Sequence, residues 1–251
     1  MADGVPTTAL EGRRVLVAGA STGLGAAVVA ICAGAGAAVG AIARASEALE
    51  QVARSAGAVA APADLRNPAE ASDAVAQVAA ALGGIDAVVI TAGVMLHSPI
   101  GDGRTEDWDE IYGANVLGTL HVAHAALPHL RKAVHGDLMI VSSTSADRVT
   151  AADYGVYAST KAAQSRIADA LRLELAASAP NVRVTLVKPG FMNTPGLGKG
   201  TRNPEVRERI VALKERIGLR PGLVATEIRH LLELPSEVTV AEVTIVPTAR
   251  A

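Results

Sequence analysis

Length, composition and charge already exclude several classes of protein. The chain has 251 residues, a formal net charge of −2 and a pI near 6.3, so its charge gives no reason to bind nucleic acid or an anionic membrane. Its five aromatic residues are too few for a surface that stacks on bases. Cys32 is the single cysteine and cannot form an internal disulfide. Residues 1–10 lack the basic region and apolar core of a signal peptide, so we expect a cytoplasmic protein.

Apolar runs alternate with helix-forming segments along the whole chain, and no linker-like tract interrupts them. The pattern predicts seven strands, at 14–18, 37–43, 57–61, 86–91, 137–142, 182–187 and 242–246. Between them it predicts helices at 23–33, 46–55, 68–82, 105–132 in two pieces, 156–178, 204–215 and 224–233. Because helical crossovers join parallel strands, we expect an α/β fold with a doubly wound, parallel, seven-stranded sheet of Rossmann type. Helices should cover both faces of the sheet, in a single domain spanning residues 1–251.

Residues 15–43 contain no charged side chain and are long enough to cross a bilayer. Six glycines interrupt this stretch, and Ser21 and Thr22 lie near its middle. A buried unit of strand, turn, helix and strand explains the segment better than a membrane span does.

The first predicted strand leads into Gly19-Ala20-Ser21-Thr22-Gly23-Leu24-Gly25 and then into a helix of small residues. Glycines in such a turn let the backbone approach a pyrophosphate and let the helix pack close to the sheet. The helix N-terminus adds unpaired N–H groups and a partial positive charge. The turn is therefore predicted to bind a dinucleotide, through Gly19, Ser21, Thr22, Gly23, Leu24 and Gly25.

Tyr157 and Lys161 lie four residues apart in a predicted helix, so both side chains project from one face. An ammonium one turn away favours the phenolate, and proton transfer near neutral pH needs a shift of roughly 3 units from the usual phenol pKa of ~10. Such a pair also arises by chance in lysine-containing helices. Together with the glycine-rich turn, it predicts a site of proton transfer.

Together with the glycine-rich turn and the Tyr/Lys pair, five further motifs in order resemble those of the short-chain dehydrogenase/reductase family, from about residue 10 to about residue 246. They are Ala63-Asp64-Leu65, whose Asp touches the adenine in that family, Thr91-Ala92-Gly93, Asn115-Val116-Leu117-Gly118, the strand ending in Ser142-Ser143, and Pro189-Gly190 followed by Thr194. The resemblance implies hydride transfer between a CH–OH carbon and NAD(P), with Asn115, Ser143, Tyr157 and Lys161 as catalytic residues. It further implies cofactor contacts from Asp64, Leu65, Thr91, Ala92, Gly93, Tyr157, Lys161, Pro189, Gly190 and Thr194.

The same resemblance assigns roles within the reaction. Tyr157 is expected to donate a proton to the carbonyl oxygen during reduction, and Ser143 to hold that oxygen. Lys161 is expected to lower the pKa of Tyr157 and to bond the nicotinamide ribose. Asn115 is expected to support a water that links Lys161 to solvent.

Three positions depart from the family pattern. Ala18 replaces the usual threonine before the glycine-rich turn, and Thr91 stands where the family carries an asparagine but keeps a hydroxyl for a similar hydrogen bond. The commonest spacing before Tyr157 selects Thr144 as the catalytic hydroxyl, whereas the end of the strand selects Ser143. We choose Ser143, with one extra loop residue between Asp147 and Val156.

The end of the second strand predicts the choice of cofactor. An NAD-specific site places an acid there, but this chain has Ala43 followed by Arg44. A guanidinium can pair with a 2′-phosphate through two hydrogen bonds, so we expect NADP(H), with NAD less favoured.

Further expectations concern the substrate and assembly. The family resemblance places a substrate lid at 191–215, and His97 is predicted to line the pocket. The C-terminal end, 242–250, resembles a branch that acts on hydroxy acids and small aldehydes or alcohols. The helices near 105–132 and 156–178 have apolar faces on both sides, among them Ala123 and Leu171, and the resemblance makes these faces the dimer and tetramer contacts, so we expect a homotetramer, otherwise a homodimer.

Several alternatives remain open at this point. The spacing of His121, His124 and His129 does not indicate a metal site, and we expect none. Epimerase and dehydratase relatives share the Tyr/Lys pair but are usually longer and have a different glycine spacing. A regulator or scaffold that senses the dinucleotide without turnover is the alternative outside enzymes.

Overall fold

A single parallel sheet forms the centre of the protein. The computed structural model describes residues 9–149, 151–198, 201 and 204–248. The sheet has seven strands in the order β3-β2-β1-β4-β5-β6-β7, and every pairing is parallel. Their bounds are β1 (Arg14–Ala18), β2 (Ala38–Ala43), β3 (Val59–Pro62), β4 (Ala87–Ile90), β5 (Gly136–Val141), β6 (Val182–Pro189) and β7 (Glu242–Ile245). The predicted fold class is confirmed.

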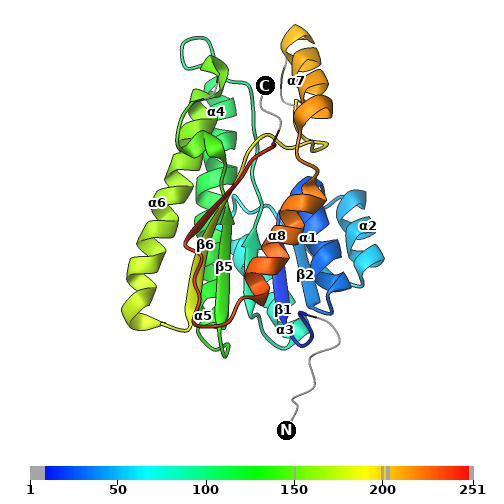
Figure 1. Cartoon of the computed structure of the whole chain (residues 1–251), viewed down its shortest axis with the longest axis vertical. Coiled ribbons are helices and arrows are strands. Elements are labelled where there is room, and N and C mark those ends of the chain that lie inside the picture. Colours follow the sequence, from blue (N-terminus) through cyan, green and yellow to red (C-terminus); the bar gives the residue numbers. More distant parts are fainter. Residues whose placement is uncertain (1–8, 150, 199–200, 202–203, 249–251) are drawn as a thin grey trace.

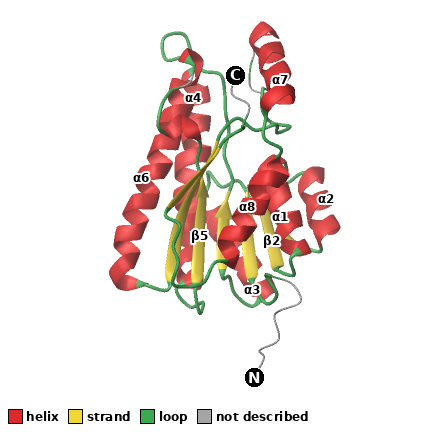
Figure 2. Cartoon of the chain, in the orientation of Figure 1, coloured by secondary structure: helices red, strands yellow, loops and turns green. Residues whose placement is uncertain are grey.

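Helices cover both faces of this sheet (Figures 1 and 2). They are α1 (Gly23–Gly34), α2 (Glu47–Ala56), α3 (Pro68–Leu82), α4 (Thr105–Tyr112), α5 (Gly118–Leu130), α6 (Gly155–Ser178), α7 (Pro204–Ile217) and α8 (Pro221–Glu233). Capping residues determine where several of these helices begin and end. Asn67 caps α3 by accepting a hydrogen bond from the Ala69 N–H, and Gly57 and Gly83 end α2 and α3 in the left-handed conformation. Among the residues described, no helix combines the length and apolar character needed to cross a bilayer.

Two apolar cores flank the sheet, as the alternation of side chains in β1 illustrates. Leu16 and Ala18 pack with residues of α3, α5 and α6, whereas Val15 and Val17 pack with residues of α1, α2 and α8. All four side chains are fully buried. Strands covered on both faces are largely apolar, which explains the uncharged stretch 15–43 without a membrane.

The connections reverse direction between β1 and β4, and this reversal positions the site. From β1 the chain adds β2 and β3 on one side, and then returns to place β4 on the other side of β1. The strand arrows point toward the end of the sheet where α4 and α7 lie (Figure 2). Ligands of open α/β sheets bind in the crevice at such a reversal, beyond the carboxyl ends of the strands.

The helical segment predicted in two pieces over 105–132 is interrupted by a π-helical turn. This turn, Gly113–Leu117, joins α4 to α5, and the Gly118 N–H donates to the Gly113 carbonyl. Such turns displace backbone groups from the regular helical pattern and are frequent at functional sites. Asn115 lies at the centre of this turn.

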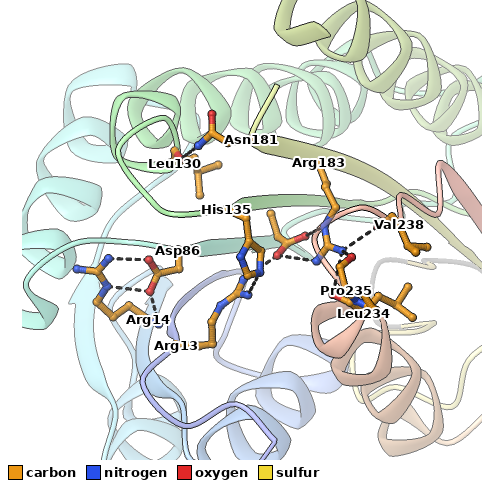
Figure 3. A network of polar contacts seen from close by, with 11 residues as sticks. Arg13, Arg14, Asp86, Leu130, His135, Asn181, Arg183, Leu234, Pro235 and Val238 are labelled. Atoms are coloured by element: carbon orange, nitrogen blue, oxygen red, sulfur yellow. Dashed lines mark hydrogen bonds and ion pairs between the residues drawn. The ribbon is translucent and has the colours of Figure 1, made fainter. Parts of the chain in front are cut away.

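The opposite end of the sheet is tied together by ion pairs (Figure 3). Arg14 on β1 bonds both carboxylate oxygens of Asp86, and Arg13 pairs with Asp137 at 2.6 Å. These contacts join the amino ends of neighbouring strands, far from the crevice.

Candidate functional site

The glycine-rich turn and the end of β4 approach each other too closely for larger residues. Gly19 has a φ of 90°, and a Cβ on it would lie 2.5 Å from the Ala92 nitrogen. A Cβ on Gly25 would lie 2.1 Å from the Gly19 carbonyl oxygen. Thr91 Oγ1 donates to the Ala18 carbonyl at 2.9 Å, which is the hydrogen bond expected of that hydroxyl. The two loops thus form one compact floor of backbone at the reversal point.

The start of α1 leaves backbone donors for a ligand. Thr22 precedes the helix in an extended conformation and makes no side-chain capping hydrogen bond. Gly23 opens the helix with a φ of 58°, and a Cβ there would lie 3.4 Å from the Thr194 side chain. The predicted phosphate turn and Thr194 of the segment after β6 therefore face each other. An uncapped N-terminus lined with glycine fits a pyrophosphate.

Beyond β2, two arginines lie around Asp64. Arg44 is exposed and makes no hydrogen bond or ion pair among the residues described, and its charge helps to lower the pKa of Asp64. The largest cause of that lowered pKa is Arg66, which bonds both carboxylate oxygens of Asp64. The carboxylate predicted to contact adenine is thus held by Arg66. Sequence reasoning missed this residue, although its position two residues after Asp64 was a signal. Leu65 is buried in the core, and its carbonyl oxygen lies 2.9 Å from His121 Nδ1.

Ser143 and Tyr157 meet beyond the end of β5. Ser143 opens a short 3₁₀ turn, Thr144–Ala146, and its hydroxyl accepts a hydrogen bond from the Ser145 N–H at 3.1 Å. A side-chain hydrogen bond from Ser143 lowers the pKa of Tyr157, so the hydroxyl beside the phenol is Ser143 and not Thr144. Ser142 instead points to the Lys161 carbonyl at 2.9 Å, a structural contact.

The pKa of Tyr157 moves in the direction opposite to the one predicted. Burial raises it to about 12, and the Ser143 hydrogen bond offsets only part of that effect. Lys161 Nζ lies 5.6 Å from the centre of the phenol ring. Burial also lowers the pKa of Lys161 to about 7, which reduces the charge available to favour a phenolate. The sequence shows the spacing of the pair but not how far both groups are removed from water.

Asn115 organises the floor of the site, and among the described residues its side chain makes no hydrogen bond with Lys161. Its Oδ1 accepts from the Val94 N–H at 2.7 Å, and its Nδ2 donates to the Val94 carbonyl and to Thr160 Oγ1, both at 3.0 Å. These bonds fix the loop after β4 to α6. A Cβ on Gly93, in the same loop, would lie 2.9 Å from Asn115 Oδ1, so a larger residue there would displace the Asn115 side chain. The link between Asn115 and Lys161 runs through Gln164, a residue that the sequence reasoning did not identify.

The sixth strand is two residues longer than the predicted 182–187, so Pro189 belongs to it. Pro189 ends the strand, and the Gly190 N–H donates to the Ile245 carbonyl at 2.7 Å. Lys188, just before it, pairs with Asp147 at 2.9 Å and with Glu242 of β7. This pair anchors the loop after Ser143 to the sheet. Within the predicted lid, 199–200 and 202–203 lie outside the described residues.

His97 belongs to a polar cluster that lies close to Tyr157. Its Nε2 is 2.6 Å from Asp153 Oδ2, and its ring packs edge-on against Tyr154. Tyr154 has a side-chain hydrogen bond with Thr201 of the predicted lid, and it adds to the raised pKa of Tyr157. This cluster joins three segments separated in sequence at one side of the site.

Comparison with known proteins identifies the family. The family model described as short chain dehydrogenase matches residues 13–205. Over 243 residues the chain is 32% identical to an uncharacterised oxidoreductase of Staphylococcus aureus (strain USA300), with 96% of this chain and 99% of that protein covered. The chain belongs to the short-chain dehydrogenase family. It is therefore an oxidoreductase that acts on CH–OH groups with NAD(P), as predicted.

Solved short-chain dehydrogenases share its architecture. An alcohol dehydrogenase from the archaeon Thermococcus sibiricus, complexed with 5-hydroxy-NADP, superposes with a TM-score of 0.83 at 25% identity, with 95% of this chain and 98% of that chain covered. A short chain dehydrogenase from Burkholderia cenocepacia J2315 in complex with NADP gives a TM-score of 0.81 at 28% identity, covering 94% and 97%. Among the described residues of this dehydrogenase, no group of three His, Cys, Asp or Glu side chains is placed to hold a metal ion.

Proposed function

We propose that the protein is an NADP(H)-dependent carbonyl reductase that interconverts a small alcohol or hydroxy acid and its carbonyl compound. The observation that carries this proposal is the pairing of Ser143 and Tyr157 at the crevice, with buried Lys161 one helical turn away. The uncapped glycine-rich start of α1 fits the cofactor pyrophosphate, and Gly93 lies so close to Lys161 that a Cβ on it would be 3.6 Å from Nζ. A bound nicotinamide would supply the hydride.

In the proposed reaction, the residues of this chain orient the substrate and move its proton. Tyr157 donates the phenolic proton to the substrate oxygen during reduction, because a phenol with a pKa of about 12 is fully protonated at neutral pH. Ser143 holds the same oxygen with its hydroxyl. Lys161 bonds the ribose, and Asn115 keeps the loop after β4 in register with α6.

Arg44 supports the preference for NADP(H). Its guanidinium is exposed beyond β2 and makes no ion pair among the described residues, which leaves it available for a 2′-phosphate. The nearby Asp64 would repel that phosphate, but its charge is already paired with Arg66.

His97, Asp153 and Tyr154 form the wall that we assign to the substrate pocket, with Thr201 and the segment 191–215 as its lid. A wall of imidazole, carboxylate and phenol is polar, so it favours a substrate with a second hydroxyl, carbonyl or carboxylate group over a plain hydrocarbon chain.

The assembly that we propose is a cytoplasmic homotetramer, or otherwise a homodimer. Tyr112 at the end of α4, Leu117 in the π-helical turn and Leu120 in α5 are 44%, 49% and 41% exposed. Ala123 and Leu171, which the sequence also assigned to the apolar faces, are buried in the core of the monomer. Light scattering at micromolar concentration should show a species larger than 25.4 kDa, and a monomer would contradict the assembly.

The test of function is oxidation of NADPH against a panel of small aldehydes, ketones and oxo acids. Wild-type protein should turn over at least one member, and Tyr157→Phe should retain less than about a tenth of that activity while still binding NADPH, since it loses only the proton donor. Lys161→Ala should lose both turnover and binding. Binding by the wild type without turnover on any compound would favour the regulator instead.

A further inference from the structure

Gln164 lies three residues after Lys161 on α6, and its side chain is completely buried. Its Oε1 accepts a hydrogen bond from Lys161 Nζ at 2.9 Å. Its Nε2 donates to the Asn115 carbonyl and to Thr119 Oγ1, both at 2.9 Å. One amide therefore connects the lysine to the helix that carries Asn115, and both of its N–H groups are used.

The network admits one orientation of this amide. The Asn115 carbonyl is an acceptor only, and the Lys161 ammonium is a donor only. Turning the amide over would place its NH₂ group against the ammonium and its oxygen against the carbonyl, so that two attractions would become two repulsions. Gln164 thus presents a fixed acceptor to Lys161.

The same contacts use both acceptor positions of the Asn115 carbonyl oxygen. It accepts from Thr119 Oγ1 at 2.7 Å as well as from Gln164, which accounts for both lone pairs. A water placed between this carbonyl and Lys161 would have to displace one of these donors. The family resemblance implies a water at Asn115 that serves Lys161, and the structure provides a direct side-chain link through Gln164.

We propose that Gln164 is a positioning residue for Lys161, whose ammonium it fixes to the π-helical turn at Asn115. Lys161 Nζ also donates to the Val141 carbonyl at 3.2 Å, so two of its three N–H groups are held by the protein. The third makes no hydrogen bond among the described residues, which leaves it for the ribose in the proposed reaction. The role of that third N–H rests on the proposed function, but the link through Gln164 does not.

The link has a measurable electrostatic effect on Lys161. An acceptor bonded to the ammonium favours its charged form, and so opposes the burial that lowers the pKa of Lys161 to about 7 in the wild-type protein. Tyr157 on α6 is the titratable group that faces the ammonium, and β5 and the loop after β4 present backbone to it. Gln164 therefore limits how far burial can discharge the lysine.

The test follows the Cε signals of the five lysines by NMR in full-length protein labelled with ¹³C-lysine. Lys161→Arg assigns the Lys161 signal, whose midpoint in the wild type should lie near pH 7. Because a charge-assisted hydrogen bond corresponds to about 1–2 pKa units, Gln164→Leu should lower the midpoint by about one unit or more. Gln164→Glu should raise it, since a carboxylate then faces the ammonium.

Ser165→Ala is the matched control. Ser165 is buried on the same helix and contacts the Lys161 carbonyl at 3.4 Å, not the ammonium, so its loss should leave the midpoint unchanged. A Gln164→Leu variant that melts earlier but keeps the wild-type midpoint would show that Gln164 only packs, and would overturn the proposal. If Gln164→Leu does not fold, Gln164→Glu decides alone, and an unmoved midpoint overturns the proposal.

A kinetic measurement separates this inference from the proposed function. If the wild type reduces a carbonyl compound, the pH profile of kcat/KM should move with the Lys161 midpoint in both Gln164 variants. If it reduces none, the proposed function fails, while the NMR titration still decides the role of Gln164.

Discussion

Arg183 Nε donates to Asp137 Oδ1 at 2.7 Å, and both side chains are buried at the amino ends of β5 and β6. The two residues are direct partners in the strand register. Arg183 Nη1 also donates to the carbonyls of Leu234, Pro235 and Val238, at 3.1, 2.8 and 2.8 Å (Figure 3). A single guanidinium thus holds the connection between α8 and β7 against the sheet.

Arg183→Met should destabilise the protein by about 3–5 kcal/mol, because it leaves a buried carboxylate with one cation fewer and three carbonyls without a donor. Arg183→Lys should recover only part of this loss, since an ammonium cannot reproduce the planar array of donors. Urea denaturation measures the free energy of unfolding of both variants. Arg166→Met is the control, because Arg166 is 81% exposed and its ion pair should contribute less than about 1 kcal/mol. Equal effects of Arg183→Met and Arg166→Met would contradict this account.

Asp86, which lies at the same end of the sheet, should make the stability of the protein depend on pH. Burial would raise its pKa, but hydrogen bonds from the Arg14 side chain and backbone N–H outweigh burial and hold the pKa below its ordinary value. A lowered folded-state pKa stabilises the protein above the unfolded value of about 3.9, and this contribution is lost as pH falls through the folded value.

Asp86→Asn should therefore lower the free energy of unfolding, measured by urea denaturation, by about 1.5–3 kcal/mol at pH 7. The difference from wild type should shrink as the solution is acidified below about pH 4. A difference that stays constant from pH 7 to strongly acidic solution would show that packing, and not the charge of Asp86, is responsible.

The sequence predicted the elements better than it predicted the contacts between them. β1 has the bounds predicted from its apolar run, whereas α8 begins at Pro221, three residues earlier than expected, since proline is well placed in a first helical turn. For the π-helical turn, the sequence predicts a break within 105–132 but not the backbone pattern of that break.

The same distinction applies to the site. Tyr157 and Lys161 share a helix, so their spacing was visible, but Gln164 bonds Asn115 across 49 positions and His97 bonds Asp153 across 56. Such contacts depend on the tertiary structure. The direction of the Tyr157 pKa was predicted wrongly for a related reason, since burial is a property of the folded chain.

The raised pKa of Tyr157 can be tested directly in the protein without added cofactor. The chain has three tyrosines, so the ultraviolet absorbance of tyrosinate can be assigned by difference. Because the pKa of Tyr157 is about 12, wild type and Tyr157→Phe should have the same titration curve up to about pH 10. Additional tyrosinate in the wild type at lower pH would mean that Lys161 controls the phenol after all.

Arg44 should determine which cofactor is preferred. A charge-assisted pair between its guanidinium and a 2′-phosphate is worth about 1.5–3 kcal/mol, so kcat/KM should be about tenfold or more higher for NADPH than for NADH. Arg44→Ala should remove most of this preference, and Ala43→Asp combined with Arg44→Ala should reverse it, because the new carboxylate accepts from the ribose and repels phosphate. Arg54→Ala is the matched control, since Arg54 is an exposed arginine near the end of α2 that bonds Gln51 on the same helix. Wild-type kinetics that are equal or better with NADH would show that Arg44 does not recognise the phosphate.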